Sequence, residues 1–208
     1  ADLFTSSTLT LMAGVSGAVT WSRVFANWVV VYAGNCLGAL FLVGLILLSG
    51  HPWESGGEIA AYYVATTMRK LSFSFPEAVG LGILCNLMVC LGVWMSYAGR
   101  SVIDKMAAGL FPVGLFISCG FEHSVANMFM IPSGILCFKL APAEMAARFA
   151  DPAALREAMT WSNFFLANLL PVTIGNIIGG GVLVGLCNWF VHLGPGGGRE
   201  ARPSDPAR

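Results

Sequence analysis

The sequence contains little charge. Only 11% of its 208 residues are Asp, Glu, Lys or Arg and 56% are hydrophobic, whereas soluble domains carry about 25% charged residues. The 11 basic and 11 acidic side chains cancel, so the positive excess typical of nucleic-acid-binding proteins is missing. These shortages exclude an ordinary soluble domain, suggest no nucleic-acid partner and predict an all-α integral membrane protein that contacts lipid.

Motifs for metal, phosphate and redox chemistry are also missing. The six cysteines form no CxxC pair, and their apolar surroundings indicate free thiols that pack as small apolar residues. No Gly-Lys-Ser/Thr follows the glycine run at 179–181, which excludes a phosphate loop. Of three histidines only His123 is expected deep in the membrane, so a bis-histidine haem or a His-rich metal site is excluded. We expect no cofactor, no metal and no enzyme activity; the rival hypothesis is a membrane-embedded enzyme that uses Glu122 and His123.

Long uncharged stretches predict membrane-crossing segments, because about 20 helical residues span the hydrocarbon core. We expect complete spans at about 24–49, 78–99 and 164–193 and a broken span at 106–138. Residues 1–14 are too few to cross, so we expect an irregular start followed by a half-span.

The polar stretches between the spans are predicted to lie outside the lipid core. Residues 50–77 form one connection, with a short surface helix at 58–70. Residues 139–163 form the other, with two short helices that begin at Pro142 and Pro152.

The spans are expected to belong to one transmembrane channel domain at 1–193. The Gly/Pro-rich segment 194–208 is predicted to be a disordered tail. Six basic residues on one side against five on the other favour a cytoplasmic C-terminus. The expected location is therefore the cell inner membrane, crossed several times.

Glu122 and His123 stand side by side in the middle of the broken span. Sixteen uncharged residues precede the pair and 15 follow it, so the two flanks cross a bilayer only together. Ionisable side chains at this depth are costly and mark a site or a pathway. The alternative is a buried polar pair that packs helices together.

An internal repeat links two of the spans. Residues 34–45 read GNCLGALFLVGL and residues 175–186 read GNIIGGGVLVGL, which agree at seven of 12 positions at an offset of 141. Two intervening spans place the copies in opposite directions across the membrane. The sequence therefore predicts an inverted-topology repeat of three spans, with the substrate site at broken helices near the midplane.

The repeat also predicts that this chain is a fragment. Residues 1–14 correspond to the latter part of the broken span, with Asp2 aligned to Glu122 at an offset of 120. The complete protein is then expected to have six spans, and this chain to lack the first span and half of the second. An upstream reading frame with fewer than about 40 apolar residues would contradict this expectation, since two helical segments of ~20 residues are needed.

Four segments resemble the formate/nitrite transporter family, and within it the formate channels. They are ADLFTS (1–6), NLMVCLGVWMSYAGRS (86–101), GFEHSVANMFMIP (120–132) and NLLPVTIGNIIGGGVLVGL (168–186). The likeness extends over nearly the whole chain, up to the tail. It implies an aquaporin-like fold of six spans, broken at the second and fifth, and a homopentamer with one pore in each protomer and cytoplasmic termini.

The resemblance also implies which side chains line the pore. His123 is similar to the family's central histidine, and Glu122 to its neighbour at the break. Leu3, Phe4 and Thr5 are similar to a mobile loop that gates the cytoplasmic side. The remaining implied residues are Phe116 at the cytoplasmic constriction, Val89 in the pore wall, Asn86 and Asn176 as polar partners, and Lys70 at the periplasmic vestibule.

These residues predict a mechanism for small anions of weak acids. Formic acid is an anion near neutral pH, and an apolar constriction disfavours an anion. We expect His123 to donate a hydrogen bond or a proton to it, and Lys70 to attract it. The predicted function is bidirectional, pH-dependent formate transport. The alternatives are a nitrite or hydrosulfide channel of the same family, or a neutral-solute channel of aquaporin type, although paired Asn-Pro-Ala boxes are absent.

Overall fold

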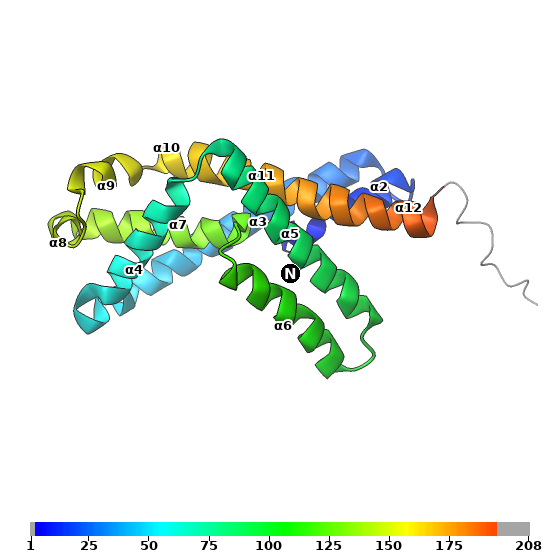
Figure 1. The fold of residues 1–208 in the computed structure, drawn as a ribbon, viewed down its shortest axis with the longest axis horizontal. Helices are drawn as coiled ribbons and strands as arrows, with labels where there is room; N and C mark the ends of the chain where they lie inside the picture. The colour runs from blue at the N-terminus through cyan, green and yellow to red at the C-terminus, as the bar shows by residue number, and fades with distance from the viewer. Residues whose placement is uncertain (1–2, 195–208) are drawn as a thin grey trace, which may run out of the picture.

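The computed structural model describes residues 3–194, and this part of the chain is helical and contains no strand (Figure 1). In chain order the elements are α1 (Phe4–Ser7), α2 (Thr10–Val15), α3 (Trp21–Leu48), the 3-10 turn η1 (His51–Trp53), α4 (Glu54–Leu71), α5 (Phe75–Ala98), α6 (Val102–Ser118), α7 (Ser124–Leu140), α8 (Pro142–Ala147), α9 (Pro152–Ala158), α10 (Trp161–Asn163), the π-helical η2 (Phe164–Leu169), α11 (Leu170–Asn176), the π-helical η3 (Ile177–Leu186) and α12 (Cys187–Leu193). Asp2 and all of the predicted tail except Gly194 lie outside the described residues.

Three helices are long and apolar enough to cross a membrane. They are Trp21–Leu48 with 28 residues, Phe75–Ala98 with 24 and the continuous helix Trp161–Leu193 with 33. Each overlaps one predicted span. The last one widens into π-helical turns at η2 and η3 without breaking.

The broken span consists of two separate helices. α6 ends at Ser118 and α7 begins at Ser124, so the interruption falls at the Glu-His pair as predicted. In Figure 1, α5 and α6 form a hairpin that diverges from the rest of the molecule, whereas α7 continues in the opposite direction towards α8. The break therefore lies where these two arms meet.

The predicted surface helix at 58–70 is more deeply placed than expected. α4 packs along α7, and it buries Ala60, Val64, Thr67 and Lys70. Its start is bent, because Ser55 and the two glycines after it adopt positive φ angles. The last turn of α4 thus buries Lys70 while Arg69 beside it stays exposed.

Local capping explains where several helices begin. At α6, Ser101 Oγ accepts from the Asp104 N–H at 3.1 Å, while Asp104 accepts from the Ser101 N–H at 2.9 Å. This reciprocal pair forms a capping box. Asp151 caps α9 by accepting from two backbone N–H groups at 3.0 Å, as the Asp-Pro sequence predicts.

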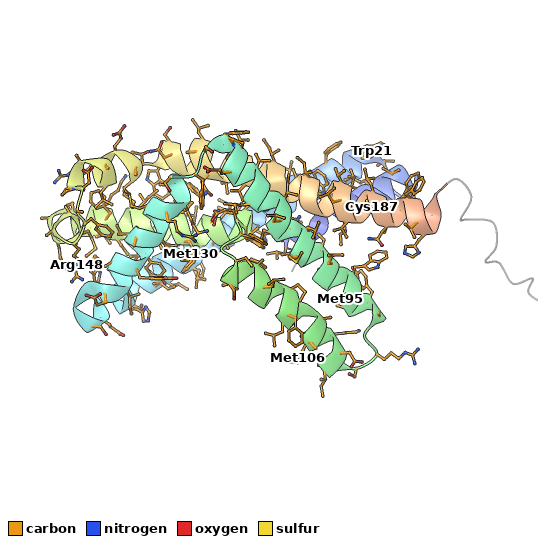
Figure 2. All side chains as sticks on the ribbon, viewed as in Figure 1. Trp21, Met95, Met106, Met130, Arg148 and Cys187 are labelled. Carbon is orange, nitrogen blue, oxygen red and sulfur yellow. The ribbon has the colours of Figure 1, made fainter. Side chains whose placement is uncertain are left out.

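The core has two parts that meet near the break. The larger joins α4 and α7, with Val64 packed among Met128, Ile131 and Ile135. The smaller contains Cys85 and Val89 of α5 and Phe116 of α6. Figure 2 shows that side chains cover the full length of the molecule, from Arg148 at one end to Cys187 near the other.

Candidate functional site

The connection between α6 and α7 is short and tightly held. Gly120 has a φ of +70°, a left-handed conformation that favours glycine. The next residues extend, and the Glu122 N–H donates to the Leu81 carbonyl of α5 at 3.3 Å. His123 then takes extended backbone angles and starts α7. The break thus presents Glu122 and His123 from a fixed backbone.

His123 is the N-cap of α7 through its own ring. Its Nδ1 accepts from the Ala126 N–H at 3.1 Å. A nitrogen that accepts carries no proton, so the proton of the neutral ring is on Nε2. Nε2 lies 3.3 Å from Thr5 Oγ1, and the Phe116 ring stacks on the imidazole with 5.6 Å between centroids. The N-cap position of α7 therefore belongs to His123 and not to Glu122.

Glu122 points to a lysine from a distant part of the chain. Its Oε1 lies 2.8 Å from Lys70 Nζ, and the two side chains are 0% and 9% exposed. The other oxygen, Oε2, accepts from Asn127 Nδ2 at 2.7 Å and from Asn168 Nδ2 at 3.2 Å. Three side-chain donors therefore surround its two oxygens, and one of them is the Lys70 ammonium. The result is a buried ion pair with no net charge.

Asn127 and Asn168 are site residues that the sequence reasoning did not select. They bond to each other at 2.7 Å, and Asn168 also donates to the Lys70 carbonyl at 2.9 Å. Both were visible in the sequence as amides within apolar segments, because Asn127 lies in the GFEHSVANMFMIP segment and Asn168 begins the NLLPVTIGNIIGGGVLVGL segment. Their common partner, Glu122, could not be seen without the fold.

Asn176 holds both sides of the break. Its amide donates to the Gly82 carbonyl at 2.8 Å and to the Glu122 carbonyl at 3.1 Å, and its oxygen accepts from the Ser124 N–H at 2.9 Å. The side chain is fully buried. All of these partners are backbone groups, so Asn176 positions the chain immediately before and after His123.

Asn86 does the same for the N-terminal segment. Its amide donates to the Thr5 carbonyl at 3.0 Å and to Thr8 Oγ1 at 3.1 Å. Cys90, one turn later, donates to the same Thr5 carbonyl at 3.4 Å. Asn86 and Asn176 were predicted as polar partners of the pore, and the structure shows that they bond to the backbone that carries the candidate pore residues.

The apolar candidates differ in what they contact. Phe116 and Val89 are buried in the smaller core cluster. Leu3 is 38% exposed. Phe4 is buried against the Tyr32 ring, with 4.8 Å between centroids. Phe116 contacts His123 directly, whereas Phe4 packs against Tyr32 of α3.

The arrangement places an imidazole N–H donor beside a hydroxyl and an aromatic ring. The Nε2 group of His123 lies between the Thr5 hydroxyl and the Phe116 ring. The nearby charges on Lys70 and Glu122 cancel. Such a site can stabilise a small polar or anionic group through a hydrogen bond without holding it by a full opposite charge.

Residues 1–190 match the sequence profile of the formate/nitrite transporter family. The chain is 49% identical over 193 residues to the formate channel FocA of Escherichia coli K12, covering 93% of this chain and 68% of that protein. It is 45% identical to the formate channel FocA of Haemophilus influenzae, covering 89% of this chain and 65% of that one. A solved structure described as a pentameric formate channel with formate bound superposes with a TM-score of 0.82 at 42% identity, covering 92% of this chain and 75% of that one.

Proposed function

Because the chain belongs to the formate/nitrite transporter family, we propose that it conducts formate across a membrane through a pore centred on His123, without enzymatic catalysis. The relatives bear names of channels and one solved relative is described with formate bound. The observation that carries the proposal is the Nε2 group of His123, which faces Thr5 at the break between α6 and α7.

The tautomer of His123 defines what it does for the anion. Since Nδ1 accepts from the Ala126 N–H, the neutral ring offers Nε2–H as a donor and has no second proton to release. A formate oxygen that replaces the Thr5 hydroxyl at Nε2 receives a charge-assisted hydrogen bond at the point where water is stripped away. Of the two roles expected for His123, this geometry favours hydrogen-bond donation over proton transfer.

The ion pair next to His123 supports conduction rather than tight binding. An unpaired Lys70 at this depth would hold an anion strongly, whereas conduction requires that the anion also leaves. Glu122 lies 2.8 Å from Lys70 and neutralises its charge. The passing anion therefore meets the His123 donor without being held by a free ammonium. Proton uptake at Nδ1 would break the Ala126 bond, and it is the proposed origin of pH dependence.

The proposal includes an inverted repeat of the spans. Asn35 and Asn176 are paired by the 141-residue offset, and Phe4 and Ser124 by the 120-residue offset. In the structure the Phe4 N–H donates to Asn35 Oδ1 at 2.8 Å, and the Ser124 N–H donates to Asn176 Oδ1 at 2.9 Å. Equivalent bonds at the two breaks support repeats related by a pseudo-twofold axis.

The proposed complete protein is a homopentamer in the cell inner membrane with a cytoplasmic C-terminus. Support for the pentamer comes from the pentameric relative, and support for the membrane from three helices that are long and apolar enough to cross it. The orientation rests on the small excess of basic residues in the sequence.

The test is formate flux into proteoliposomes, with His123→Asn as the informative variant. The Asn oxygen is able to replace Nδ1 as the helix cap, but no group reaches the position of Nε2. We expect folded protein, a loss of formate flux of tenfold or more, which corresponds to a charge-assisted hydrogen bond of about 1.5–3 kcal/mol, and no remaining pH dependence. His51→Asn, on the exposed turn η1, is the matched control.

Three results would change the proposal. Unchanged flux in His123→Asn would remove the histidine from the mechanism. Parent protein that passes nitrite or hydrosulfide but not formate would assign another anion of the same family. Flux of uncharged solutes that ignores pH would favour a neutral-solute channel.

A further inference from the structure

Lys70 is not free to bring an anion to the pore site. Lys70 was predicted to attract the substrate, but its ammonium is buried and bonded to Glu122 at 2.8 Å. An ion pair presents little net field to an approaching anion. Electrostatic capture, which raises anion concentration at a channel mouth, therefore requires another positive group.

The residue before Lys70 meets this requirement. Arg69 is exposed on the last turn of α4, and its Nη1 lies 3.2 Å from the position that a Cβ on Gly120 would occupy. Gly120 is three residues from His123 in the connection that breaks the span. The guanidinium thus lies against the break while the Lys70 side chain turns inward.

The charge of Arg69 is not neutralised by the rest of the described chain. Within residues 3–194 the ion pairs are Lys70 with Glu122, and Arg148 with Glu58 and Glu144. None of the three involves Arg69, whose carbonyl, rather than its side chain, bonds to Ser72. A full positive charge is therefore available beside the pore site.

We propose that Arg69 captures the anion at the break and passes it to His123, and that its planar guanidinium favours anions with two oxygens in one plane. This inference rests on the proposed function. A guanidinium donates two parallel hydrogen bonds to a carboxylate, whereas an ammonium acts as a point charge. Formate and nitrite match this fork and hydrosulfide does not. Because Arg69 is exposed, water competes with the captured anion and lets it move on.

The experiment compares initial formate uptake by the reconstituted parent, Arg69→Gln and Arg69→Lys over a range of formate concentrations and salt. Arg156→Gln, an exposed arginine on α9, is the matched control for loss of one charge. We expect Arg69→Gln to raise the half-saturating formate concentration about tenfold at low salt with little change in maximal flux, the lower end of electrostatic steering. The difference from the control should vanish as salt screens the charge over ~3 Å at 1 M.

The lysine variant separates shape from charge. Compared with Arg69→Gln, Arg69→Lys should restore most of the hydrosulfide uptake at low salt, because the positive charge remains. It should restore less of the formate uptake, because the planar guanidinium is lost. A half-saturation and salt dependence of Arg69→Gln equal to those of Arg156→Gln would overturn the role of Arg69 while leaving the formate channel intact. Absence of formate flux in the parent would instead overturn both proposals.

Discussion

His123 combines two tasks that usually fall to different residues. Its Nδ1 closes the first turn of α7, and its Nε2 faces Thr5. The bond at Nδ1 therefore sets the tautomer of the ring, and with it the N–H that Nε2 presents. The neighbouring Glu122 does not touch the ring in any bond seen here, since its oxygens bond to Lys70, Asn127 and Asn168. The pair that looks like one motif in the sequence thus has separate partners: His123 faces Thr5, and Glu122 belongs to a buried ion pair.

Lys70→Met should destabilise the protein strongly. It leaves the fully buried Glu122 carboxylate without its counter-charge, and breaking a buried pair costs about 3–5 kcal/mol. Equilibrium unfolding in mixed micelles measures this loss, with the exposed Lys105→Met as control. The double variant Lys70→Met with Glu122→Gln should recover most of the loss, because no uncompensated charge remains. A double variant no better than the single one would contradict the ion-pair account.

At the scale of elements, close approach of helices is what builds the site. Gly179 and Gly180 of η3 face α5 and the N-terminal segment, where an added Cβ would meet the Ile83 backbone or the side chains of Asn86 and Thr8. The glycine run at 179–181, which the sequence excludes as a phosphate loop, is thus the surface against which α5 and Asn86 pack. With larger residues there, α5 would lie further from η3, and the Asn86 amide further from Thr5.

Gly180→Ala tests this contact. The methyl group would push against the polar cluster of Asn86, Thr8 and Cys90, and overpacking of this kind costs about 1–3 kcal/mol. Gly185→Ala on the same helix is the control, because its nearest neighbour is 3.4 Å away. We expect a lower unfolding temperature and reduced formate flux for Gly180→Ala alone. Equal behaviour of the two variants would show that the helices have room to adjust.

At the scale of the whole molecule, residues 3–194 leave much apolar surface exposed. On α3, Val29, Val30, Leu37 and Phe41 are each 68–70% exposed, and α6 exposes Phe111 to 74%. An exposed apolar patch of this extent marks contact with lipid or with other subunits. Lipid contacts and subunit contacts can be told apart by experiment, because subunit contacts survive in detergent.

Native mass spectrometry of the detergent-solubilised protein is expected to show an assembly of five copies of the 22.0 kDa chain. Replacing exposed α3 residues such as Leu37 by Asn should weaken the assembly if α3 lies between subunits and leave it intact if α3 faces lipid. A protein that stays monomeric at all concentrations would contradict the proposed pentamer.

Much of this architecture can be predicted from local features. The uncharged stretches locate the helices at 21–48, 75–98 and 161–193 to within a few residues, because lipid requires continuous apolar helices of about 20 residues. The charged pair in an apolar span locates the break at 119–123. The helix expected at 58–70 lies within α4, where packing along α7 buries one face while Tyr62 and Arg69 stay exposed.

Hydropathy and the spacing of charges are thus enough to place the spans, the break and His123 along the chain. They do not contain the partners, since Glu122 bonds to a lysine 52 residues away and His123 faces a threonine 118 residues away. Such contacts depend on how helices approach one another, and the glycines and amides that permit the approach do not reveal their partners in the sequence. Packing alone therefore buries Lys70, leaves Arg69 exposed beside Gly120 and turns the Nε2 of His123 towards Thr5.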